Sequence, residues 1–316
     1  MPPKRRAHNA KADAVSTAKK SKKATQDGRS DVLDQLDKTF QYHHTSELLS
    51  FWNFAKSLNE TSPYEAFSQL EGLKLVGVFR FLNGETTEND SEYFFWDRFK
   101  TDLPEMQTIL TYKDGRFAFW RDSPMDKPIL VHVDKKPNFP KIEVVGSNDP
   151  FFAVAYLVGS NTKVAEKYLP EPVENYKATL KTIVQKRRKD SVGSAFHGPK
   201  IQVPIRGDVG YRSVSDSPAK LKKKLETFMT TEDEEVKAKL RKELLELKSY
   251  IDFANDEMDY GMGLEFGHDL FLANNKVFEN LAFRVLETAY NLLKRTKYTE
   301  FTRLMRSADG IRLGLE

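Results

Sequence analysis

Apolar residues in this chain follow two spacings, one typical of strands and one of helices, and the strand-like runs are confined to the first half. Between residues 73 and 145, short runs rich in β-branched and aromatic residues predict a small, mostly antiparallel sheet. Lys113-Asp114-Gly115, between two of these runs, is typical of a hairpin turn. The predicted strands are Leu73–Phe81, Gln107–Tyr112, Arg116–Trp120, Ile129–Val133 and Ile142–Val145, with a polar loop at Asn83–Glu92.

Helical spacing precedes the strands in residues 31–55 and dominates the chain after residue 150. Pro170 and Pro172 mark the boundary between the two parts. We therefore predict an α+β fold, with an N-terminal α+β domain at residues 31–170 and a mainly helical C-terminal domain at residues 171–316. The helices predicted beyond residue 150 are Phe151–Val158, Val173–Lys189, Pro218–Met229, Glu234–Ala254, Leu264–Leu272, Lys276–Leu293 and Tyr298–Met305.

Positive charge is concentrated at the N-terminus. Residues 1–30 contain nine lysines and arginines against two aspartates, a net charge of +7, and almost no large apolar side chains. This composition predicts a disordered basic tail. Its clusters Lys4-Arg5-Arg6 and Lys19-Lys20-Ser21-Lys22-Lys23 resemble a bipartite nuclear import signal and also suit weak contact with DNA. The alternative is a generic solvated tail.

The folded part is slightly acidic. The whole chain has a net charge of +4 and its tail +7, which leaves −3 for residues 31–316, a poor basis for a dedicated nucleic-acid-binding surface. Lys186-Arg187-Arg188-Lys189 ends a predicted helix; it either suits the helix dipole, which we favour, or forms a second DNA-contacting patch. The chain has no cysteine, which excludes disulfides and thiolate chemistry, and no apolar run long enough to predict a membrane-spanning helix.

A cluster of acids marks the candidate site. The predicted helix Glu234–Ala254 has an apolar face with three- and four-residue spacing, and Asp252, Asp256, Glu257 and Asp259 crowd its C-terminal end. Carboxylates are disfavoured there by the helix dipole, so two acids held at this end form a candidate site. The alternative, which the pattern alone favours, is a solvated helix end paired with nearby lysines. The glycines that follow suit a sharp turn or a close backbone approach; they are Gly261 and Gly263.

A second candidate segment precedes this helix. In Asp208-Val209-Gly210-Tyr211-Arg212, Gly210 permits a tight turn beneath an aromatic residue and an arginine, which are both enriched at binding hot spots. His197, in Phe196-His197-Gly198, has no serine or carboxylate pattern around it, so we interpret it as a structural or interface residue.

Motifs of nucleotide-binding loops, zinc proteases and serine hydrolases are missing from the sequence. Asp256 and Glu257 are adjacent and diverge around a helix, so they are poorly placed to face each other across a bond. A stand-alone carboxylate-dependent hydrolase or transferase using these two acids remains the alternative function, and it requires its own substrate pocket.

The string Phe253–Leu264 resembles the signature of the histone PARylation factor 1 family, the accessory proteins of DNA-damage-activated poly(ADP-ribose) polymerases. Phe196-His197-Gly198, the segment Asp208–Arg212 and Ala289–Arg295 occur in the same order and at similar spacing in that family. Met258 departs from the family, which usually has a cysteine there.

The resemblance implies a factor that docks on the catalytic domain of the polymerase and directs ADP-ribosylation to serine, including on histones. Glu257 matches the catalytic glutamate of the family and Asp256 the neighbouring acid that contacts the polymerase. Arg212 matches an arginine of the docking surface, where we also place Tyr211 and Asp208. NAD is then bound by the polymerase, and this chain binds no cofactor or metal and is not an autonomous enzyme. We expect a monomer in the nucleus, on the chromosome at sites of DNA damage, without membrane contact.

Overall fold

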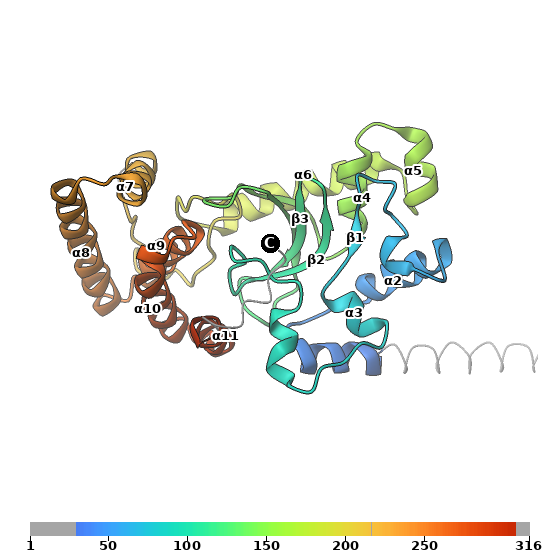
Figure 1. Cartoon of the computed structure of the whole chain (residues 1–316), viewed down its shortest axis with the longest axis horizontal. Coiled ribbons are helices and arrows are strands. Elements are labelled where there is room, and N and C mark those ends of the chain that lie inside the picture. The colour runs from blue at the N-terminus through green and yellow to red at the C-terminus, as the bar shows by residue number, and fades with distance from the viewer. Residues whose placement is uncertain (1–29, 216, 308–316) are drawn as a thin grey trace, which may run out of the picture.

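The computed structural model describes residues 30–215 and 217–307 (Figure 1). Apart from Ser30, which belongs to the helical residues 30–40, the predicted basic tail lies outside this range. The predictions of nuclear import and of DNA contact by the tail therefore fall outside the described residues.

Five antiparallel strands form one sheet in which neighbours along the chain are also neighbours in space. The first contributes only two paired residues, whereas Tyr112 and Gly115 close a tight hairpin between the second and third strands, as predicted. Together with the helices that follow, this sheet confirms the predicted α+β fold. The strands are β1 (Lys74–Leu75), β2 (Met106–Tyr112), β3 (Gly115–Trp120), β4 (Ile129–Asp134) and β5 (Ile142–Gly146).

The predicted strand Leu73–Phe81 is wrong for most of its length. After β1 the chain turns at Gly77, whose φ is +60° and whose added Cβ would lie 2.6 Å from the Thr108 carbonyl oxygen. Helix α3 (Val78–Leu82) follows. Val78 and Phe79 are buried in the core, and a short helix and a short strand with buried residues give the same apolar run. The predicted loop Asn83–Glu92 also ends in helical residues, since the 3-10 helix η2 (Asp90–Phe95) begins within it.

Aromatic side chains fill the core beneath the sheet. Phe51 stacks on Phe67 at 5.0 Å between ring centroids and meets Phe151 edge-on at 4.9 Å. Trp52 and Trp120 are buried, whereas Trp96 is half-buried under Arg80. The surrounding helices are α2 (Ser46–Leu58), η1 (Pro63–Glu65), α4 (Phe151–Val158) and α5 (Thr162–Tyr168).

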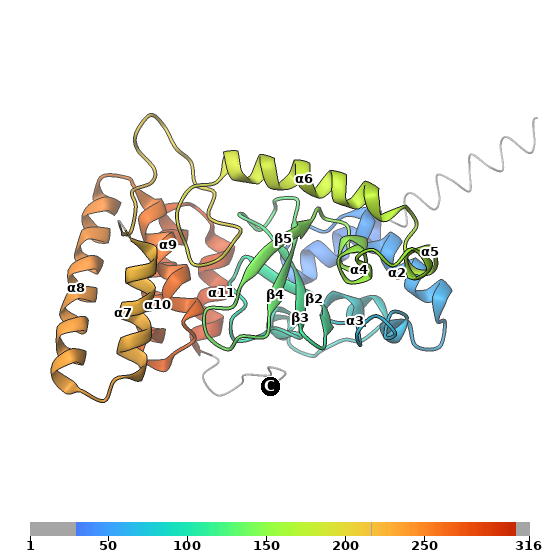
Figure 2. The same cartoon turned by 90° about the horizontal axis from the view of Figure 1, so that it is seen from above.

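The second half of the chain is helical, as predicted. Figure 2 shows α6 running along one side of the sheet, with α7 to α11 gathered at the end opposite α2, α4 and α5. Helix α9 is the centre of this group: every residue from Gly261 to Leu272 is buried, against α10 and α8. The helices are α6 (Val173–Asp190), α7 (Pro218–Thr230), α8 (Glu234–Asp256), α9 (Tyr260–Leu272), α10 (Lys276–Leu292) and α11 (Thr296–Ser307).

A buried polar cluster joins the sheet to the helices. The Glu105 carboxylate, just before β2, accepts hydrogen bonds from the Tyr290 hydroxyl at 2.8 and 2.9 Å and lies 3.0 Å from His268 Nε2. Since a carboxylate only accepts, this places the hydrogen on His268 Nε2 and makes Nδ1 the acceptor for His197 Nε2 at 3.0 Å. Burial holds the pKa of His197 well below its usual value. His197 is therefore structural, as predicted, and both halves share one core.

Candidate functional site

Helix α8 ends in a left-handed turn that carries the two predicted acids. Asp256 is its last residue and Glu257 its C-cap, both exposed. Met258 has a φ of +66°, and the Asp259 N–H donates to the Ala254 carbonyl at 2.7 Å, which together close the helix in the manner of a Schellman motif. The 60% exposed Glu257 carboxylate thus stands on a fixed backbone at the helix end.

The predicted role of the two glycines is partly wrong. Met258, and neither glycine, makes the sharp turn; Gly261 and Gly263 lie inside α9, which begins four residues earlier than predicted. The expected close approach does occur at Gly261. Its N–H donates to the Gly210 carbonyl at 3.0 Å, and a Cβ there would lie 3.0 Å from that same oxygen. The start of α9 is therefore in direct contact with the backbone of the preceding loop.

Asp259 fixes this loop to the helix end. Its Oδ1 accepts from the Gly210 N–H at 2.8 Å, and its Oδ2 lies 3.0 Å from Arg212 Nη2. The same guanidinium nitrogen donates to Glu257, and this hydrogen bond raises the pKa of Arg212. Arg212 is half-exposed whereas Asp259 is buried, so a buried acid positions an exposed arginine beside an exposed acid.

Glu265 anchors the other side of the loop. Its Oε2 accepts from the Tyr211 hydroxyl at 2.7 Å, and its Oε1 accepts from the backbone and hydroxyl of Ser194 at 2.8 and 3.0 Å. Burial, followed by this contact with Glu265, raises the pKa of Tyr211. One turn further along α9, Asp269 accepts from the Phe196 N–H at 2.8 Å, and burial raises the pKa of its carboxyl well above the usual value.

The structure brings most of the predicted site residues together. Arg212 contacts Glu257, Asp256 precedes Glu257 in the chain, and the neighbour of Arg212, Tyr211, is hydrogen-bonded to Glu265. Asp208 lies apart, at the exposed tip of a turn in which Arg206 and Val209 exchange backbone hydrogen bonds of 2.9 and 3.2 Å. No side-chain hydrogen bond or ion pair within residues 30–215 and 217–307 involves Asp208, so its assignment to the docking surface remains a prediction.

Sequence reasoning placed Asp259 in the acid cluster but missed its anchoring role. It missed Glu265 and several exposed apolar residues altogether. Acids four residues apart within an otherwise apolar helix, such as Glu265 and Asp269, are a signal that could have found the anchors. The exposed apolar side chains around the cluster belong to Ile205, Val209, Phe253 and Met258.

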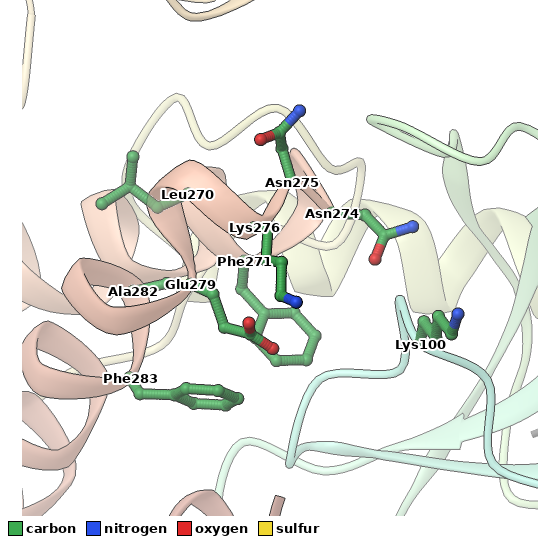
Figure 3. A pocket seen from close by; sticks show the side chains of 9 residues that line it. All are labelled: Lys100, Leu270, Phe271, Asn274, Asn275, Lys276, Glu279, Ala282 and Phe283. Carbon is green, nitrogen blue, oxygen red and sulfur yellow. The ribbon is translucent and has the colours of Figure 1, made fainter. Parts of the chain in front are cut away.

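A groove of about 850 Å³ opens beside the acid–arginine cluster. Arg212, Glu257, Leu221 of α7 and Leu244 of α8 are among the residues that line it, whereas Asp256 does not border it. A second hollow of about 410 Å³ lies between Lys100 and the turn from α9 to α10 (Figure 3). Aromatic rings and two lysines surround it, and it shares no residue with the predicted site.

Across the part of the chain that the structure describes, no three histidine or acidic side chains gather in a way that would hold a metal ion. None of the helices in those residues is long and apolar enough to span a membrane.

The cluster thus combines exposed acids, an arginine and exposed apolar side chains. Arginine and aromatic residues are enriched at protein–protein interfaces, whereas acids are depleted there. Comparison with known proteins agrees with the sequence resemblance. The chain belongs to the histone PARylation factor 1 family, whose model matches residues 31–306.

Individual members of the family are similar over most of their length. Histone PARylation factor 1 of Bos taurus is 30% identical over 307 residues, which cover 89% of this chain and 88% of that protein. Histone PARylation factor 1 of Danio rerio and the putative histone PARylation factor 1-like protein of Homo sapiens are also 30% identical, with the same coverage. The predicted family is therefore confirmed.

Proposed function

We propose that this chain docks on the catalytic domain of a DNA-damage-activated poly(ADP-ribose) polymerase and supplies Glu257 as the general base for ADP-ribosylation of serine, including on histones. The polymerase binds NAD, and the composite site works in the nucleus, at damaged chromosomal DNA. The observation that supports this proposal is the exposed Glu257 carboxylate, which stands at a rigid helix end with Asp256 and Arg212 beside it.

The chemistry requires an exposed base. A serine hydroxyl is a poor nucleophile while protonated, and a positioned carboxylate takes its proton as the oxygen bonds to the ribose carbon and nicotinamide leaves. Such help is typically worth about 10²–10⁴-fold in rate. An enclosed carboxylate such as Glu265, already hydrogen-bonded to Tyr211 and Ser194, cannot reach a hydroxyl on another protein. Glu257 can.

In the free chain, Glu257 is not yet an available base, because its carboxylate accepts a hydrogen bond from Arg212. The guanidinium occupies a carboxylate oxygen that would otherwise be open to the serine hydroxyl. Arg212 also lies 3.0 Å from Asp259, so the guanidinium retains one acidic partner when it leaves Glu257. We propose that docking draws Arg212 toward the polymerase and thereby frees Glu257.

Glu257→Gln is expected to reduce serine modification by 100-fold or more while polymerase binding is retained. The amide keeps the shape of the side chain and its hydrogen-bonding capacity but cannot take up a proton. The measurement is transfer of labelled ADP-ribose from NAD to a serine peptide, with the variant titrated against a fixed amount of polymerase.

Two further variants make this titration decisive. Asp256→Ala should act through docking and recover at high concentration, while Glu235→Gln, at the exposed start of α8, should behave as wild type. Recovery of wild-type activity by Glu257→Gln at high concentration would mean that the glutamate only binds, and the shared-site mechanism would fail.

Arg212→Ala is expected to weaken polymerase binding by tenfold or more, as truncation of an interface arginine typically does. At saturating concentration its activity should approach that of the wild type, because Glu257 then has no guanidinium to displace. Calorimetry measures the affinity, and Arg284→Ala on α10, which removes another exposed arginine, is the control. Unchanged affinity with an intact fold would remove Arg212 from the docking surface.

The groove beside Glu257 favours one competing function, a stand-alone carboxylate-dependent hydrolase or transferase, because it places open space at this acid. Asp256 does not border the groove, so the two acids do not act on one bond there. NAD turnover by the purified chain without any polymerase tests this alternative, and robust turnover would support it against our proposal.

A further inference from the structure

Helix α6 packs on the rest of the molecule through one narrow face, and most of its circumference is exposed to solvent (Figure 2). Its 18 residues include six lysines and arginines against two acids, a net charge of +4 within a folded part whose total is negative. The side chains that face the core and are buried or half-buried belong to Val173, Tyr176, Leu180, Ile183 and Arg187.

Three cations form a line on the exposed side, which we call the α6 stripe: Lys177, Lys181 and Arg188. At about 100° per residue their directions fall within about 40° of one another, and the stripe is about 16 Å long. Each is exposed, and none makes an ion pair or a side-chain hydrogen bond with another residue in the described ranges. Three cations are thus aligned along one rigid element without an internal partner.

Cations with a structural role in this chain have hydrogen-bond or ion-pair partners within it. Arg187, next to the stripe, is buried and donates to Asp122 and to the Pro199 carbonyl, so it joins α6 to the sheet. Some lysines on other helices pair with acids instead, as Lys248 does with Asp252 on α8. The basic cluster expected at the end of this helix therefore divides into one buried structural arginine and a set of free cations.

We propose that the α6 stripe binds double-stranded DNA through its phosphates. DNA carries one charge per roughly 1.7 Å of helix axis, so a 16 Å row of cations has phosphates within reach at every position. The negative total of the folded part does not oppose this binding, because charges more than roughly 10 Å away are largely screened. Glu174, in the first turn of α6, and Asp190, its last residue, flank the stripe and do not interrupt it.

The stripe leads into the proposed docking surface. The chain continues from the end of α6 through the loop that carries Arg212, along the same side of the molecule (Figure 2). DNA held by α6 would tether the chain at the site where a DNA-damage-activated polymerase is itself bound. The binding is independent of Glu257 and is tested without polymerase.

The test measures binding of a fluorescent 20-base-pair duplex to the full chain by anisotropy, between 50 and 200 mM salt. The variant Lys177→Gln/Lys181→Gln/Arg188→Gln should bind at least tenfold more weakly at 50 mM salt. The slope of log affinity against log salt should become shallower by about 2 to 3, because each lost phosphate contact removes about 0.9. Because the three substituted side chains are exposed, we expect the variant to have the same thermal unfolding temperature as the wild type.

A matched control removes the same charge elsewhere. Lys237→Gln/Lys248→Gln/Lys297→Gln replaces three partly exposed lysines that each pair with an acid, and it should change the affinity less than threefold. Equal losses in both variants, or no loss in either, would overturn the proposal, as would more effective displacement by polyglutamate than by unlabelled DNA. If the triple variant does not fold, Arg188→Gln alone should make the slope shallower by about 1.

Discussion

The acids at the end of α8 and those inside α9 are close in sequence, yet they differ in exposure and in their hydrogen-bond partners. Asp256 and Glu257 are exposed; the only side-chain partner of Glu257 in the described ranges is Arg212, and Asp256 has none there. Glu265 and Asp269 are buried and accept hydrogen bonds from Ser194, Tyr211 and Phe196. The buried carboxylates accept hydrogen bonds from groups of the same chain, whereas the exposed carboxylates can accept hydrogen bonds from another molecule.

The two groups also depend on each other. Glu265 and Asp259 fix the loop from 193 to 212, and this loop places Arg212 against Glu257. The cost of burying acids is tolerated because their donors are supplied by backbone and hydroxyl groups. The exposed pair is therefore positioned by buried acids that themselves have no access to a partner protein.

Removal of a buried acid should have the largest effect on stability. Glu265→Ala leaves the Tyr211 hydroxyl and the Ser194 N–H without an acceptor, and we expect it to lower the free energy of unfolding by about 3 kcal/mol or more. Urea unfolding measures this change. Glu265→Gln, which keeps one acceptor oxygen, should recover part of the loss. A loss no larger than that of an exposed acid would contradict the division between the two groups.

The pH dependence of stability should come from buried groups. Burial lowers the pKa of His44 to about 4, although it lies between Asp37 and Gln107. The folded pKa is below the unfolded value of about 6.5, so the unfolded state binds the proton more readily in this window. His44 therefore stabilises the fold fully above about pH 6.5, and this contribution is lost as the pH falls toward 4.

Between pH 7.5 and 5.0 the contribution of His44 amounts to about 2 kcal/mol. Urea unfolding of the wild type and of His44→Gln at both values isolates it, because Asp269 and the other buried groups contribute equally to both proteins. Burial lowers the pKa of His197 as well, so part of the pH dependence should survive in the variant. Identical pH dependence in the two proteins would mean that folding does not shift the pKa of His44, and the prediction would fail.

The elements that could be predicted from the sequence are those whose apolar residues follow a recognisable pattern. Helices α6 to α8, α10 and α11 bury faces that repeat along the sequence, so these helices were accessible from the chain alone. Strands β2 to β4 are buried along most of their length and were recognised as apolar runs. The helix Val78–Leu82 was not predicted, because a short apolar run in which only Val78 and Phe79 are buried does not distinguish a helix from a strand.

The candidate site divides in the same way. The acids at the end of α8 are local in sequence and were found there. The contact between Arg212 and Glu257 depends on the Asp259–Gly210 hydrogen bond and on the missing side chain of Gly261. These contacts join residues about 50 positions apart, and no local spacing encodes them. The family resemblance identified the site residues, whereas the hydrogen bonds that hold them in place could be seen only in the structure.

The smallest effect is expected where the exposed acids are neutralised. Asp256→Asn and Glu257→Gln each remove negative charge from the C-terminal end of α8, where the helix dipole disfavours it, so either should leave stability unchanged or raise it by about 0.5 kcal/mol. In Glu257→Gln this gain is offset by the loss of the ion pair with Arg212, which is weak because both side chains are at least half-exposed. Thermal unfolding of both variants beside Glu265→Gln provides the comparison. Marked destabilisation by Glu257→Gln would mean that the Arg212 pair holds the loop in place, and Glu257 would then belong with the structural acids of α9.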